Sequence, residues 1–194
     1  MNKISIPFGK SLNKHYCDII AFSCDIKTNP TQNIKQFSYL TLNIHNKPTQ
    51  IFCGIKYQCV EYSRRWLILT YGITFEEINM AYLIFISPFI KFTNILSKQI
   101  VLYTKCFNGS HTKPIIGSIV VWDKTNNYIT GHVAIIVNID NTHIYIGEQN
   151  WDNNLWHNSY SRKIKLINIS NQYWLDDPNQ FNLKILGWLN LNNN

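Results

Sequence analysis

A cysteine, a histidine and a glutamate occupy positions from which they could together perform nucleophilic catalysis. Cys59 stands where the loop 54–58 gives way to a segment with helical spacing. The free N–H groups and positive dipole end of a helix N-terminus favour a thiolate and can receive the oxyanion of a tetrahedral intermediate. Cys59 therefore suits a nucleophile, although this segment alone still favours the plainer interpretation of a small buried apolar residue.

His132 and Glu148 lie on two valine- and isoleucine-rich stretches that predict an antiparallel hairpin. A three-residue loop, 139–141, would place His132 directly opposite Glu148 on one face of the sheet. A two-residue loop would turn Glu148 to the other face. We expect the first register, in which the carboxylate orients the imidazole and sets its tautomer. Taken alone, such a pair is as often structural as catalytic.

The elements that must position these residues change in type along the chain. Helical spacing predicts a helix over 59–71, ended by Gly72, and a second over 75–96 that breaks near Pro88. The first 50 residues are polar and turn-rich, with one short strand at 18–24. Five strands are expected after residue 115: 116–122, 132–139, 143–148, 161–167 and 184–189. This order predicts an α+β fold, with N-terminal helices packed on a C-terminal antiparallel β-sheet.

Length and composition fit one domain with its own hydrophobic core. The chain has 194 residues, of which 45% are hydrophobic. We expect a single domain over residues 1–194, with its core at about 7–189 and a frayed tail at 190–194. The N-terminus lacks the apolar core of a secretion signal, and the apolar run 80–90 is too short to span a bilayer. These features predict a cytoplasmic protein without a membrane partner.

The net charge of +7 comes from scattered basic residues. The densest groups are Arg64–Arg65 and Arg162–Lys165, and neither forms a basic arm, so we expect no nucleic-acid partner. Glu61 and Arg65 are expected to be surface charges of the helix.

The cysteines form no CxxC and no zinc-ligand spacing, which predicts neither a disulfide framework nor a metal site. They are Cys17, Cys24, Cys53, Cys59 and Cys106, and all except Cys59 are expected to be structural.

The run Tyr57–Arg65 resembles the nucleophile motif of CHAP amidases. More narrowly, it resembles the amidase domain of glutathionylspermidine synthetase/amidase and trypanothione synthetase. The resemblance covers roughly residues 7–189 and implies a papain-like fold of the NlpC/P60 and CHAP type. Further motif matches follow in the same order: 7–9, 79–81, 108–110, 121–124, 130–136, 148–150 and 185–188.

The resemblance implies a role for each catalytic residue. Cys59 would attack the amide carbonyl and form a thioester with the glutathionyl glycine. His132 would take the thiol proton and later protonate the leaving amine, while Glu148 would orient and stabilise His132. Gln58 would help the backbone N–H of Cys59 to stabilise the oxyanion.

The same resemblance assigns two substrate-binding residues. Arg64 would bind the acidic end of the substrate, and Asn150 would line the pocket. The sequence after Asn150 departs from the stretch expected for the family, which leaves the preference among amines open. Asp152, Glu76 or Glu77 could meet the amine.

The function expected from these features is hydrolysis of the amide between glutathione and a polyamine such as spermidine, without a metal or organic cofactor. The partner would be this small molecule; the sequence leaves the oligomeric state open. The chain is too short for the ATP-dependent ligase domain of these relatives, so we expect hydrolysis without synthesis. Two alternatives are a peptidoglycan amidase or endopeptidase, and a module that binds a glutathione conjugate or a protein without catalysis.

Overall fold

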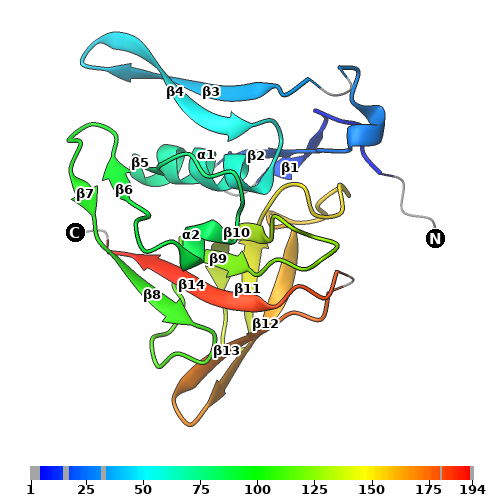
Figure 1. Cartoon of the computed structure of the whole chain (residues 1–194), viewed down its shortest axis with the longest axis vertical. Helices are drawn as coiled ribbons and strands as arrows, with labels where there is room; N and C mark the ends of the chain where they lie inside the picture. Colours follow the sequence, from blue (N-terminus) through cyan, green and yellow to red (C-terminus); the bar gives the residue numbers. More distant parts are fainter. Residues whose placement is uncertain (1–4, 15–17, 32–33, 180, 193–194) are drawn as a thin grey trace.

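A computed structural model describes residues 5–14, 18–31, 34–179 and 181–192, and strands dominate these ranges (Figure 1). The largest element is a seven-stranded antiparallel sheet in the order β13-β12-β11-β10-β9-β14-β8. Its strands are β8 (Tyr103–Phe107), β9 (Ile119–Trp122), β10 (His132–Ile139), β11 (His143–Gly147), β12 (Arg162–Ile169), β13 (Gln172–Asp176) and β14 (Ile185–Leu191).

Smaller antiparallel sheets come from the first half of the chain. They contain β1 (Ser11–Lys14) with β2 (Ile20–Phe22), β3 (Phe37–Ile44) with β4 (Lys47–Ile55), and β5 (Ile73–Phe75) with β6 (Phe92–Asn94) and β7 (Ile100–Val101). The helices in the described ranges are the 3₁₀ turn η1 (Ile26–Thr28), α1 (Cys59–Tyr71) and α2 (Leu83–Ile86). Neither α-helix is long and apolar enough to cross a membrane.

Helix α1 has the bounds that the sequence predicts. It ends at Gly72, whose left-handed backbone (φ 65°) lets its N–H bond to the carbonyls of Leu67 and Ile68. The helix contacts β10, β4 and β5, and Figure 1 shows it between the β3–β4 hairpin and the large sheet. Both sides of α1 are therefore covered, which is why most of its first ten residues are buried.

The predicted α+β fold, with N-terminal helices packed on a C-terminal sheet, is wrong, because the first half contains the strands β1 to β6 and its α-helices are only α1 and the single-turn α2 among the described residues. The expected helix over 75–96 reduces to the single turn α2. Ser87 precedes Pro88 and has an extended backbone (φ −63°, ψ 128°), as sterics before proline require. The flanking segments pair as β5 and β6. The stretch is rich in isoleucine and phenylalanine, and periodicity alone does not separate strand from helix in short apolar runs.

Most of the β3–β4 hairpin lies within the first 50 residues, which were predicted to be polar and turn-rich. Its loop is His45–Asn46, both with positive φ (50° and 61°), and Ile44 pairs with Lys47 across it. Two successive left-handed residues are typical of the type I′ turn that closes two-residue hairpins. The sequence pattern that could have predicted this hairpin is Asn46 between two stretches in which apolar and polar residues alternate.

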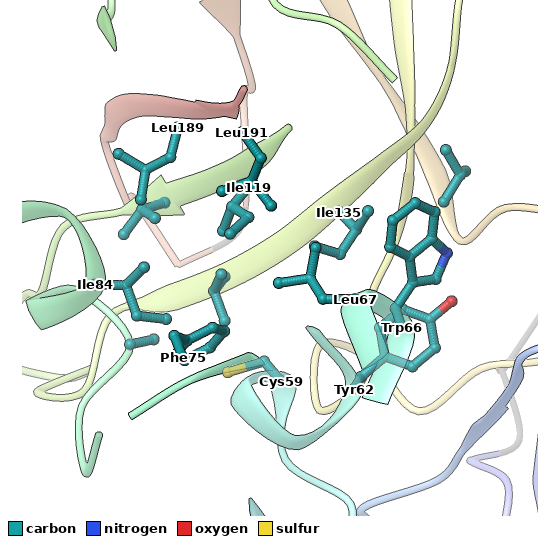
Figure 2. Close-up of a cluster of buried hydrophobic side chains, with 14 of the residues drawn as sticks. Cys59, Tyr62, Trp66, Leu67, Phe75, Ile84, Ile119, Ile135, Leu189 and Leu191 are labelled. Carbon is teal, nitrogen blue, oxygen red and sulfur yellow. The ribbon is translucent and has the colours of Figure 1, made fainter. Parts of the chain in front are cut away.

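In the large sheet, the five strands predicted after residue 115 are confirmed as β9, β10, β11, β12 and β14. The central strands bury side chains on both faces, and therefore read as continuous apolar runs. One face packs against α1 in the cluster of Figure 2, which includes Ile119, Ile135 and Leu189 with Tyr62, Trp66 and Leu67. The other face buries a second cluster, which includes Val120, Trp122, Ala134, Ile136, Ile146 and Ile164.

The cysteines with described positions are all free thiols: Cys24, Cys53, Cys59 and Cys106. Cys17 lies outside the described residues. Strand β14 continues to Leu191, which pairs with Tyr103 of β8.

Candidate active site

The pairing at the turn that joins β10 to β11 differs from the predicted register. Ile139 pairs with Ile144, and the N–H of Asp140 bonds to the carbonyl of His143. The predicted register, in which a loop over 139–141 sets His132 directly opposite Glu148, is therefore wrong. Continued without interruption, the observed pairing would turn His132 and Glu148 to opposite faces of the sheet.

A β-bulge at Val137 restores the common face. Ile136 pairs with Ile146 on one side of the bulge, whereas Asn138 pairs with Tyr145 on the other. The extra residue shifts the register by one, so residues 132 and 148 again have the same parity. They are diagonal neighbours rather than directly opposed, and both side chains turn to the face of the second cluster.

His132 and Glu148 meet in this diagonal arrangement. Nε2 of His132 lies 2.8 Å from Oε2 of Glu148, and both side chains are 1% exposed. Burial lowers the pKa of His132. The negative charges of Cys59 and Glu148, together with their hydrogen bonds to the imidazole, outweigh burial and raise the pKa to about 9. Because Nε2 is occupied by Glu148, Nδ1 is the ring nitrogen left for the thiol of Cys59.

Cys59 is the first residue of α1, directly after the N-cap residue Gln58. Its side chain is 7% exposed and lies at the edge of the cluster in Figure 2. Cys59 and His132 line the same cleft, and Cys59 is among the groups that raise the pKa of His132. The structure thus brings Cys59, His132 and Glu148 into one chain of contacts, from the helix N-terminus across two strands.

Glu148 has two further partners on and before β12. The Nε of Arg162 donates to its Oε1 at 2.8 Å, and the hydroxyl of Ser161 donates to the same oxygen at 2.9 Å. Burial raises the pKa of Glu148, but the charge of Arg162 and the hydrogen bond from His132 outweigh it and lower the pKa to about 2. Glu148 is therefore a carboxylate throughout the neutral range.

Arg162 was not predicted as a site residue, because in the sequence it belongs to one of the two densest basic groups, Arg162–Lys165. Arg162 pairs with Ile146 across β11 and β12, and it is in phase with the buried Ile164 and Leu166. The sequence pattern that could have indicated its burial is an arginine at a position that alternates in step with the apolar residues of the strand.

Gln58 and Asn150 contact each other beside Cys59. Asn150 has a left-handed backbone (φ 55°), and its Nδ2 donates to Oε1 of Gln58 at 2.7 Å. The amide nitrogen of Gln58 lies 3.3 Å from Sγ of Cys24. Gln58 makes no side-chain cap to α1, so its amide is held by these two contacts next to Cys59.

A cleft of about 260 Å³ opens in front of these residues. Glu77 lines it, whereas Glu76 is not among its lining residues and Asp152 lines a different hollow with His157. Of the three acids considered for an amine, only Glu77 faces this cleft. The residues lining the cleft include Gln58, Cys59, Arg64, Tyr128, His132 and Asn150.

Arg64 lines the same cleft as a nearly buried cation, with 6% exposure. Its guanidinium lies over the rings of Phe52 and Phe75 at 5.3 Å and 5.6 Å, and its Nε donates to the hydroxyl of Thr74 at 3.4 Å. Among the described residues no carboxylate lies within ion-pair distance of it. Burial lowers the pKa of Arg64, as expected for a desolvated cation without a bound anion.

Glu61 and Arg65, expected on the helix surface, are buried instead, with 1% and 8% exposure. Arg65 Nε donates to Glu61 Oε1 at 2.7 Å, and Arg65 also donates to the carbonyl of Ile20 and to the side chain of Gln149. Gln149 in turn donates to Glu61 at 2.8 Å. This network ties α1 to β2 and to the residue that follows Glu148.

The family model for the CHAP domain matches residues 50–150, which include all six residues predicted for the site. The bifunctional glutathionylspermidine synthetase/amidase of Escherichia coli (strain K12) is 29% identical over 190 residues, which cover 94% of this chain and 29% of that protein. The trypanothione synthetase of Crithidia fasciculata is 31% identical over 142 residues, which cover 72% of this chain and 21% of that protein. The chain therefore spans less than a third of the length of either relative.

These matches confirm the resemblance that the motifs indicated, and with it the expectation of a hydrolase acting on amide bonds. The family model covers more than half of the 194 residues, and the chain belongs to the CHAP-domain family.

Proposed function

We propose that the chain is a thiol amidase that hydrolyses the amide between the glycine carboxyl of glutathione and a polyamine such as spermidine. The observation that carries this proposal is the arrangement of Cys59, His132 and Glu148, beside a cleft that also holds Arg64, a cation with no carboxylate partner in the described part of the chain. The relatives named for glutathionylspermidine and trypanothione support the substrate class.

The first half-reaction forms a thioester. Nδ1 of His132 takes the proton of the Cys59 thiol, and the sulfur attacks the amide carbonyl carbon. The backbone N–H of Cys59, at the start of α1, and the side-chain amide of Gln58 stabilise the oxyanion. The tetrahedral intermediate collapses, the C–N bond breaks, and the imidazolium gives its proton to the leaving amine.

The second half-reaction hydrolyses this thioester. His132 removes a proton from a water molecule, which attacks the thioester carbonyl, and the C–S bond breaks. The Cys59 sulfur leaves as a thiolate and regains the proton from the imidazolium. Glu148 keeps the imidazole oriented and stabilises its charged form in both halves.

The charges of the cleft fit a substrate with an acidic half and a cationic half. Arg64 is a buried guanidinium that a substrate carboxylate would pair with, which would offset its desolvation. Glu77 is an exposed carboxylate on the same cleft and would meet an ammonium of the amine. Asn150 lines the cleft between Gln58 and the substrate.

The direct test is incubation with glutathionylspermidine and detection of free glutathione and spermidine by mass spectrometry. Release is expected from the parent protein and none from Cys59→Ala. Cys106→Ala is the matched control, because Cys106 is a buried free thiol of β8 and should retain turnover. Release by Cys59→Ala would show that the nucleophile is misassigned.

The same assay separates the alternatives. Loss of cell-wall turbidity without release of spermidine would favour a peptidoglycan amidase or endopeptidase. Saturable binding of glutathionylspermidine, with no product from either substrate, would favour a non-catalytic module.

A further inference from the structure

We propose that Arg162 is a positioning residue of the reaction, which keeps Glu148 ionised and aimed at His132 throughout the catalytic cycle. This inference rests on the Cys59–His132–Glu148 mechanism of the proposed function, but not on the identity of the substrate. Arg162 would act through Glu148 and would touch neither the substrate nor the sulfur.

The contact between Arg162 and Glu148 is a fork. Nε donates to Oε1 at 2.8 Å, and Nη2 lies 3.4 Å from Oε2, the oxygen that also faces His132. A planar guanidinium that holds both oxygens of a carboxylate fixes the rotation of that carboxylate. The hydroxyl of Ser161 holds Oε1 as well, so Oε2 is the oxygen left to orient the imidazole.

Arg162 is itself fixed on its other sides. Its Nη1 donates to Asp177, which also accepts a bond from the indole N–H of Trp122 at 2.9 Å. Its guanidinium lies 4.1 Å from the ring centre of Trp151, and that ring lies 4.7 Å from the ring centre of His132. The indole of Trp151 therefore bridges Arg162 and the imidazole, and the guanidinium has little freedom to leave Glu148.

The environment of Glu148 makes the charge of Arg162 necessary. Glu148 is 1% exposed, and burial alone favours the neutral acid. The charged and titratable groups around the pair are His132 from β10, Arg162 from β12, Tyr128 before β10 and Asp177 after β13, with Cys59 of α1 behind His132. Among the residues that the structure describes, Arg162 is the permanent cation in direct contact with Glu148.

Loss of Arg162 would therefore raise the pH at which Glu148 takes up a proton. A neutral Glu148 would no longer stabilise the imidazolium of His132, and the Cys59–His132 pair would lose its charged form at acid pH. The acid limb of activity would move to higher pH. A guanidinium that served only folding would change the amount of folded protein but not the position of this limb.

The test compares Arg162→Gln and Arg162→Lys with the control Lys163→Gln, whose parent residue is the next, exposed one of β12. Two profiles are measured against pH: kcat/KM for glutathionylspermidine, and the rate of alkylation of Cys59 by iodoacetamide. In Arg162→Gln we expect both acid limbs to move up by about one pH unit or more. We also expect kcat to fall at least about ten-fold near neutral pH, with KM within about two-fold of the parent value.

Arg162→Lys, which keeps the charge but loses the fork, should give intermediate profiles, and Lys163→Gln should match the parent. Acid limbs of Arg162→Gln that coincide with the parent, or lie at lower pH, would overturn the inference. If Arg162→Gln does not fold, Arg162→Lys decides by the same criterion. If the parent does not turn over glutathionylspermidine, the substrate proposal fails, while the alkylation profiles still decide the role of Arg162.

Discussion

Replacement of Glu61 by alanine tests whether the network of Glu61, Arg65 and Gln149 stabilises the site. Glu61 is 1% exposed and accepts hydrogen bonds from Arg65, Gln149 and Ser38. Arg65 is 8% exposed, so the variant leaves a buried guanidinium without its carboxylate. We expect a large loss of stability rather than the small effect of a surface pair.

The size of the loss follows from what remains around Arg65. Removal of one partner of a buried ion pair costs roughly 3–5 kcal/mol of unfolding free energy. Arg65 keeps its bonds to the Ile20 carbonyl at 2.8 Å and to Gln149 at 2.9 Å, so we expect the lower end, about 3 kcal/mol. For a chain of this length that corresponds to a fall in Tm of about 6–12 °C.

Chemical denaturation and a thermal melt followed by circular dichroism measure this loss. The control is Glu76→Ala, because Glu76 is exposed in the loop after β5, and it should change the unfolding free energy by less than about 0.5 kcal/mol. The double variant Glu61→Leu/Arg65→Met should cost less than the sum of the single variants, with a coupling of about 1 kcal/mol or more. A Glu61→Ala protein within about 1 kcal/mol of the parent would refute the reasoning.

Three further predictions concern the strand start and the cleft. Gly131→Ala should destabilise the protein by about 1–3 kcal/mol in denaturant titrations. The reason is that Gly131 has a φ of +62° and an added Cβ would lie 2.6 Å from the Trp122 carbonyl oxygen. An unchanged denaturation midpoint would contradict this prediction. Since the folded pKa of His132 is about 9, above the ordinary 6.5, its protonation contributes stability that is complete below about pH 6.5 and lost as pH rises through 9. The difference in unfolding free energy between the parent and His132→Gln should shrink over that window, and a constant difference would count against the raised pKa. Arg64→Met should raise KM for glutathionylspermidine by about ten-fold or more with a smaller change in kcat, and steady-state kinetics showing an unaltered KM would remove Arg64 from substrate binding.

The short-range features of the chain were accessible from its sequence. The helix of Cys59–Tyr71 follows from apolar spacing that ends at a glycine, and the central strands follow from runs of valine and isoleucine. Both patterns report burial within one element, which local residue types encode. The region 75–96 was not accessible in this way, because its apolar residues suit a strand as well as a helix and the pairing of β5 with β6 decided between them.

The residue types of the site were recognisable from sequence, but their geometry was not. Cys59, His132 and Glu148 stand in motifs, yet His132 and Glu148 share a face only because the bulge at Val137 offsets the shifted pairing at the turn. A bulge inserts one unpaired residue without altering the apolar pattern, and the sequence therefore carries no clear mark of it.

The sequence by itself thus determined where a nucleophile, a base and an acid could stand, because helix starts and strand ends are set by neighbouring residues. Only the tertiary structure decided that Arg162 holds Glu148 and that Arg65 holds Gln149, 84 positions away in the chain. Partners on other elements are chosen by packing, since a buried charge needs polar partners wherever the fold excludes water. The local pattern shows that a charge is present, and packing fixes which groups of other elements it meets.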